Sequence, residues 1–223
     1  MEKLVKSIIF DLDGTLVDTL PDIHAASSEM LKSLNLEPLP SKQVRSFIGD
    51  GIYKLIERCL NVYGVSGSKD ASRVFMEYYH ANPTTLSKCY ENVEFTLFQL
   101  KSRGLKLGIC TNKPSNLTNK VVENLSLKKY FETIICGDTL HVKKPDARPL
   151  LEAVKDLESD PESSIFIGDS EVDMKTALSA NMGFGFFTQG YHKLALGDIF
   201  CDFHFDSYLE LEKKYQNMKE SYL

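Results

Sequence analysis

Hydrophobic positions follow two different patterns along the chain. From residue 90 onward, short apolar runs typical of buried strands alternate with segments whose apolar residues recur every three or four positions, as in an amphipathic helix. The expected strands are 106–111, 131–136, 164–168, 183–187 and 202–205, and the expected helices are 93–103, 115–125, 149–157 and one that runs through 180. This alternation predicts an α/β fold with a central parallel sheet and helices on both faces.

Residues 17–89 lack the strand pattern. Apolar residues recur there only at helical spacing, and no stretch alternates for long like a half-buried strand. We therefore expect a core made of residues 1–16 and 90–223, with a small α-helical domain of residues 17–89 inserted after the first strand. Pro21 suits the first turn of its first helix, after Asp18 or Thr19 as the cap, and Ser41 is the expected cap of the second helix.

The first strand ends in two carboxylates. The apolar run before Asp11 and Asp13 reads as a buried strand, and side chains two apart on extended chain point the same way. Two like charges that close raise each other's pKa unless a cation or a donor intervenes, so the pair favours a hard divalent cation. An ordinary turn is the simpler alternative. A Ca²⁺ loop is excluded, because Thr15 and Asp22 stand where such a loop needs Asp or Asn and Glu.

Polar residues follow three further strand ends. These are Thr111-Asn112-Lys113, Lys143-Lys144-Pro145 and Gly168-Asp169-Ser170. In a parallel sheet the carboxyl ends of the strands share one edge, so Asp11, Asp13, Thr111, Lys144 and Asp169 are expected to converge there. Asp173 lies four residues after Asp169 at a helix start and should share its face.

Composition narrows the class of protein. The chain has 223 residues, 43% of them hydrophobic, and a net charge of −5, which argues against a nucleic-acid or membrane-surface binder. Five cysteines without CxxC spacing indicate reduced thiols. The N-terminus resembles neither a signal peptide nor a membrane span, so we expect a cytoplasmic protein.

Taken together, these motifs resemble those of one superfamily. Asp11-Leu-Asp-Gly-Thr15, Thr111, Lys144-Pro145 and Gly168-Asp-Ser-Glu-Val-Asp173 occur in the order and approximate spacing of the four motifs of the haloacid dehalogenase-like hydrolases. Within that superfamily the chain looks most like the phosphoglycolate phosphatases, through the segments 48–56, 111–114, 137–138 and 144–146. The resemblance covers nearly the whole chain and implies a Rossmann-like core with a helical cap domain.

The resemblance also implies a role for each motif residue. Asp11 would be the nucleophile that forms an aspartyl-phosphate, and Asp13 the general acid and base. Mg²⁺ would bind Asp11, the backbone carbonyl of Asp13, and Asp169. The phosphoryl group would be bound by the Thr111 hydroxyl, the Asn112 backbone N–H and Lys144. Asp173 would orient Lys144 or a metal-bound water, and Gly49 would belong to the cap segment that closes over the leaving group.

Several alternatives stay open. Asp169 could also serve as a helix N-cap, Asp173 could be a surface acid, and Lys113 or Arg45 could touch the substrate. Ala147 replaces the second proline usual in the family, and Asn181 replaces a common glycine.

The expected reaction is Mg²⁺-dependent hydrolysis of a small phosphate monoester, with 2-phosphoglycolate favoured and a monomer or homodimer as the active form. Competing functions are a sugar-phosphate mutase, a pyrophosphatase or nucleotide phosphatase, a phosphonate hydrolase with a cap lysine, and a non-catalytic binding protein.

Overall fold

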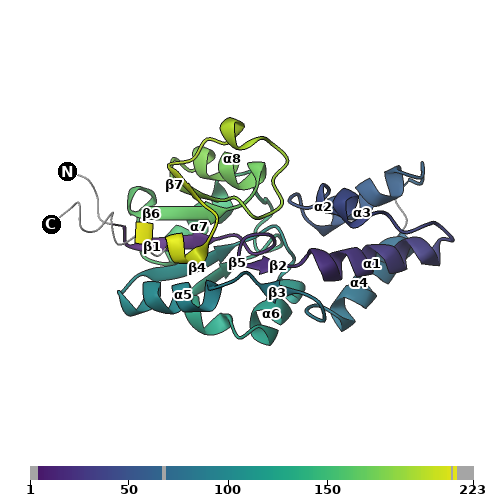
Figure 1. Ribbon diagram of the computed structural model, residues 1–223, viewed down its shortest axis with the longest axis horizontal. Helices are drawn as coiled ribbons and strands as arrows, with labels where there is room; N and C mark the ends of the chain where they lie inside the picture. The colour runs from purple at the N-terminus through teal and green to yellow at the C-terminus, as the bar shows by residue number, and fades with distance from the viewer. Residues whose placement is uncertain (1–4, 67–68, 212, 215–223) are drawn as a thin grey trace.

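A six-stranded parallel sheet forms the centre of the molecule (Figure 1). The computed structural model describes residues 5–66, 69–211 and 213–214. In the order β5-β4-β1-β6-β7-β8, the strands are Thr133–Ile135, Lys106–Cys110, Ser7–Phe10, Ser164–Gly168, Gly183–Phe187 and Phe203–Phe205. Every neighbouring pair is parallel, which confirms the fold class predicted from the sequence.

Helices cover both faces of this sheet. The alternation of side chains along β1 divides the core, because Ile8 and Phe10 join one buried cluster and Ile9 joins the other. The first cluster contains side chains of α5 (Val93–Ser102) and α6 (Ser115–Asn124). The second contains side chains of α7 (Arg148–Asp156) and α8 (Glu171–Ser179). Single turns of 3₁₀ helix complete the core at Lys128–Tyr130, Pro161–Ser163 and Leu196–Asp198.

The strand order creates a switch point at β1. After β1 the chain builds β4 and β5 on one side, and then returns to build β6, β7 and β8 on the other. Ligands of open α/β sheets bind at the carboxyl ends of strands where the order reverses in this way. Asp11, Thr111 and Asp169 are the residues that directly follow β1, β4 and β6, so the sheet alone brings them to one edge.

Four helices form a separate layer beyond this edge, on the right of Figure 1. They are α1 (Leu20–Ser33), α2 (Ser41–Arg45), α3 (Ile52–Asn61) and α4 (Lys69–Ala81). They share their own buried apolar cluster, to which the sheet-bearing part of the chain contributes Leu117 and Tyr191. We call α1–α4 and their loops the helical segment. No helix in the part of the chain that is described is long and apolar enough to cross a membrane.

Short strands join the helical segment to the sheet, and the sequence pattern missed them. β2 (Val17–Asp18) pairs antiparallel with β3 (Lys88–Cys89), where the chain enters and leaves the segment. Strands of two residues are too short to show an alternating pattern. The helix N-cap predicted at Ser41 was also wrong, since Ser41 is the first residue of α2 and the N-cap is Pro40.

Asp22 in α1 ties the end of the helical segment to its beginning. Its side chain is buried and accepts hydrogen bonds from the backbone N–H of Leu86 at 3.0 Å and of Ser87 at 2.7 Å. The Ser87 hydroxyl donates a further bond at 2.5 Å. A buried carboxylate is stable only with donors of this kind, so these bonds fix the loop before β3 against α1.

We expect Asp22→Ala to lower the free energy of unfolding by about 3 kcal/mol, because three donors of the loop lose a charged acceptor. Urea unfolding followed by circular dichroism measures the change. Glu29→Ala, at an exposed position of the same helix, is the matched control and should change it by less than about 0.5 kcal/mol. Equal effects of the two substitutions would contradict a structural role for these bonds.

Candidate active site

Three buried carboxylates gather at the carboxyl edge of the sheet. Asp11, Asp169 and Asp173 each offer an oxygen within 4.8 Å of the others. All three are less than a tenth exposed. Repulsion between buried like charges disfavours such a cluster unless cations offset it. The arrangement therefore resembles a site for a cation with oxygen ligands.

Glycines make room for Asp169. Gly14 has a φ of +88°, a conformation that other residues adopt only with strain, and a Cβ there would lie 2.5 Å from Oδ2 of Asp169. A Cβ on Gly190 would also collide with this side chain. The carboxylate is therefore held between two backbone segments that only glycine allows to come so close.

One buried lysine partly balances the cluster. The Nζ atom of Lys144 donates to Oδ1 of Asp173 at 2.6 Å and lies 2.9 Å from Oδ1 of Asp11. The other Asp173 oxygen accepts from the Ser170 hydroxyl at 2.6 Å, in the capping box that begins α8. Both oxygens of Asp173 thus have protein hydrogen-bond partners. The sequence allowed a contact with either Lys144 or a metal-bound water, and the contact observed is with Lys144.

Burial and an ion pair set the protonation of Asp11. Its buried Oδ1 atom lies 2.9 Å from Nζ of Lys144 and has no other hydrogen-bond partner among the described residues. Burial raises the pKa of Asp11 to about 7, with Lys144 opposing the shift and the charge of Asp173 adding to it. Burial also raises the pKa of Asp169, together with the charges of Asp173 and Asp11. A bound divalent cation would favour the ionised forms, so the donor set fits such an ion.

Two contacts of Asp169 were not foreseen from the sequence. The Thr15 hydroxyl donates to Oδ1 at 2.6 Å and the backbone N–H of Tyr191 donates to Oδ2 at 2.5 Å. The Tyr191 hydroxyl donates to Asp18 at 2.6 Å and accepts from the backbone of Leu20 at 2.9 Å. Thr15 belongs to the first motif and could have been suggested. Tyr191 follows no recognisable pattern, and only the fold brings it to the site.

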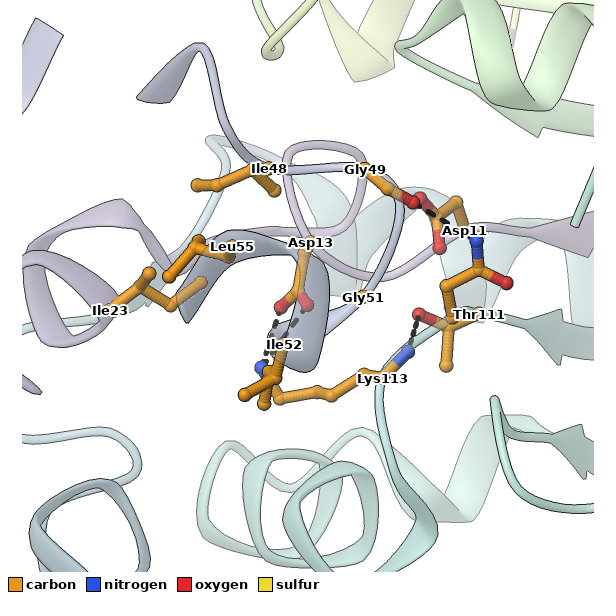
Figure 2. Close-up of a pocket in the computed structure, with 11 residues that line it drawn as sticks. Asp11, Asp13, Ile23, Ile48, Gly49, Gly51, Ile52, Leu55, Thr111 and Lys113 are labelled. Carbon is orange, nitrogen blue, oxygen red and sulfur yellow. Dashed lines mark hydrogen bonds and ion pairs between the residues drawn. The ribbon is translucent and has the colours of Figure 1, made fainter. Parts of the chain in front are cut away.

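The side chain of Asp13 lines a pocket between the helical segment and the sheet, and its carboxylate points toward Lys113 (Figure 2). Its two oxygens accept from Nζ of Lys113 at 2.9 and 3.1 Å. Lys113 also donates to the hydroxyl of Tyr79 in α4 at 2.5 Å. Lys113 also lines the pocket.

The remaining predicted residues lie where the helical segment meets the sheet. Thr111 and Asn112 line the pocket, and the Asn112 side-chain amide donates to the backbone oxygens of Gly49 and Lys144, both at 3.0 Å. Gly49 lines the same pocket. Arg45 does not: its guanidinium donates to the backbone oxygen of Gly190 and lies over the Tyr191 ring.

The pocket is small and asymmetric (Figure 2). Its cavity volume is about 30 Å³, with Asp11, Asp13, Thr111 and Lys113 on the sheet side. Ile23, Ile48, Ile52 and Leu55 of the helical segment form an apolar wall. The pocket therefore combines charged and polar side chains of the sheet-bearing part of the chain with an apolar wall from the helical segment.

Comparisons with known proteins agree with this geometry. The family model of the haloacid dehalogenase-like hydrolases matches residues 8–186, and the chain belongs to that family. It is 38% identical over 196 residues to the phosphoglycolate phosphatase of Cereibacter sphaeroides strain ATCC 17025, covering 86% of this chain and 89% of that protein. The phosphoglycolate phosphatase of Aquifex aeolicus strain VF5 is 36% identical, with 85% and 88% covered.

A solved structure is similar over nearly its full length. It is a crystal structure of a predicted phosphoglycolate phosphatase from Haemophilus somnus 129pt, 30% identical, with a TM-score of 0.89 and coverage of 94% of this chain and 97% of that chain. These similarities confirm the resemblance drawn from the motifs. The protein is a phosphoric monoester hydrolase.

We expect Mg²⁺ to raise the melting temperature of the metal-free protein, because a cation relieves repulsion among the three carboxylates. At a concentration about 100 times its Kd, the rise should be about 5–10 °C. Asp169→Asn should remove most of this rise, since one ligand charge is lost. Scanning calorimetry with and without Mg²⁺ measures both, and a rise that is unchanged in Asp169→Asn would contradict this cation site.

Tyr191→Phe is the matched control for that experiment. It removes two hydrogen bonds at the entrance to the helical segment and should lower the melting temperature of the metal-free protein by about 2–6 °C. It keeps the backbone N–H that donates to Asp169, so the Mg²⁺-induced rise should stay the same. Loss of that rise would mean that the tyrosine hydroxyl, rather than the backbone, controls Asp169.

Proposed function

We propose that this protein is a Mg²⁺-dependent phosphatase that hydrolyses 2-phosphoglycolate to glycolate and phosphate. The observation that carries the proposal is the buried Asp11, which forms an ion pair with Lys144 through Oδ1 and lines a pocket of mixed polarity. The names of the similar proteins in Cereibacter sphaeroides and Aquifex aeolicus support the choice of substrate.

The residues that would hold Mg²⁺ are Asp11, Asp169 and the backbone carbonyl of Asp13. When bound, the ion would supply positive charge that offsets repulsion between the anionic nucleophile and the anionic substrate. Asp173 is better suited to holding Lys144, because both of its oxygens already have hydrogen-bond donors. Thr15 and Tyr191 keep Asp169 oriented toward the cluster.

In the proposed first step, an oxygen of Asp11 attacks phosphorus and the bond to the glycolate oxygen breaks. That oxygen takes a proton from Asp13, whose side chain lies on the same side of the pocket. Lys144, the Thr111 hydroxyl and the Asn112 backbone N–H stabilise the charge on the phosphoryl oxygens. The product of this step is an aspartyl-phosphate on Asp11.

In the second step, Asp13 accepts a proton from water as the water oxygen attacks phosphorus. The bond between phosphorus and the Asp11 oxygen breaks, so phosphate leaves and the carboxylate is restored. Each atom that enters leaves as glycolate or phosphate, and Asp13 ends with the proton that it gave up in the first step.

We propose that residues 17–89, which contain the helical segment, form a cap over the active site. The cavity of about 30 Å³ is narrow for a phosphate ester, so we propose that the cap moves aside for substrate to enter. In its present position Asn112 contacts Gly49, and Lys143 contacts the backbone of Asp50 at 2.5 Å. These contacts would re-form over bound substrate and exclude bulk water.

Asp11→Asn is expected to lower kcat for phosphate release from 2-phosphoglycolate by about 10³-fold or more, because an amide is a poor nucleophile. Phosphate release in the presence of Mg²⁺ measures the loss. Asp198→Asn, at an exposed position far from the motif residues in sequence, is the matched control and should keep full activity. Full activity of Asp11→Asn would contradict the nucleophile assignment, and isomerisation of a sugar phosphate by the wild type would indicate a mutase.

A further inference from the structure

Lys113 is a buried cation, and the proposed reaction assigns it no direct role. Of the described lysines and arginines, only Lys113 and Lys144 are buried. Burial alone would lower the pKa of Lys113, but the charge of Asp13 and the hydroxyl of Tyr79 outweigh it and raise that pKa. Lys113 therefore stays charged on the floor of the pocket (Figure 2).

The two buried lysines lie on different sides of the reacting centre. Lys144 contacts Asp11 and Asp173, and is placed for the phosphoryl group. Lys113 contacts Asp13, the residue proposed to protonate the leaving oxygen. Among the described residues that line the pocket, Lys113 alone is a cation, and the wall opposite it is apolar.

We propose that Lys113 binds an anionic group on the leaving alcohol, and so makes the enzyme selective for phosphate esters whose alcohol carries a carboxylate close to the ester oxygen. This inference rests on the proposed phosphatase function and explains how the same pocket would choose 2-phosphoglycolate. A substrate with two anionic groups then meets two cations, one beside Asp11 and one beside Asp13.

A ligand would share Lys113 with its present partners. An ammonium group has three N–H donors, and Nζ of Lys113 donates to both oxygens of Asp13 and to the hydroxyl of Tyr79. A carboxylate on the leaving group would replace one Asp13 oxygen as an acceptor, and Asp13 would keep the other contact. The apolar wall offers no donor side chain, since it consists of Ile23, Ile48, Ile52 and Leu55. A carboxylate on the leaving group would therefore find its cationic partner at Lys113.

Tyr79 makes this recognition depend on the cap. It lies in α4, is fully buried and contacts Lys113 both through its hydroxyl and through its ring, whose centre is 4.6 Å from Nζ. Burial raises the pKa of Tyr79 to about 12, so its hydroxyl remains neutral and does not compete with the ligand's charge. The lysine is thus held in place when the cap is seated on the sheet.

The test compares two phosphate esters of equal chain length with wild type and Lys113→Met. The alcohol of 2-phosphoglycolate carries a carboxylate, whereas the alcohol of 2-hydroxyethyl phosphate is uncharged. The readout is the ratio of the two kcat/KM values, in which a general loss through Asp13 cancels. We expect wild type to prefer 2-phosphoglycolate. Lys113→Met should reduce the ratio by about 30-fold or more, mainly by raising the KM for 2-phosphoglycolate. Lys113→Arg keeps the charge and should preserve most of the preference.

A fall of the same size for both esters would overturn the proposal, because Lys113 would then only orient Asp13. Calorimetric binding of 2-phosphoglycolate to Asp11→Asn, with and without Lys113→Gln, gives a second readout that needs no turnover and should show weaker binding with the glutamine. If wild type prefers another carboxylate-bearing ester and loses that preference in Lys113→Met, the choice of 2-phosphoglycolate fails and the role of Lys113 stands. If wild type prefers phosphate esters whose alcohol is uncharged, the role of Lys113 fails while the phosphatase function stands.

Discussion

The crowding of Asp11, Asp169 and Asp173 around one lysine is the constraint on which the site depends. Three buried carboxylates within 4.8 Å repel one another, and the ammonium group of Lys144 offsets part of their charge. The protein tolerates this because the sheet, two glycines and several hydrogen-bond donors fix the side chains in place. The remaining negative charge is available to a cation and, through it, to an anionic substrate.

The same constraint explains how the helical segment is attached. The contacts that hold site residues also cross to this segment: Tyr191 joins Asp169 to Leu20, Asn112 joins Lys144 to Gly49, and Lys113 joins Asp13 to Tyr79. Each of these three residues contacts a site residue on one side and the helical segment on the other. A movement of the segment would therefore disturb the orientation of several site residues at once, and its return would restore them together.

Binding and chemistry are divided across the pocket. On the sheet side, Asp11, Thr111 and Lys144 are the residues proposed to act on the phosphoryl group, which every substrate of this enzyme class shares. The isoleucines and the leucine of the helical segment, and Lys113 across from them on the sheet side, are proposed to face the part that differs between substrates. This division accounts for strong sequence motifs on one side and weak ones on the other, because the shared group sets fixed demands and the variable group does not.

The sequence by itself determined the α/β fold and the edge of the sheet where Asp11, Thr111 and Asp169 meet, because strand periodicity is local and parallel strands end on one side. The motif order also identified the family. The two-residue strands β2 and β3 escaped prediction, since so few residues carry no period. Only the tertiary structure brought Tyr191 to Asp169 and Tyr79 to Lys113, because these contacts join residues far apart in the chain whose meeting depends on how the helical segment packs on the sheet.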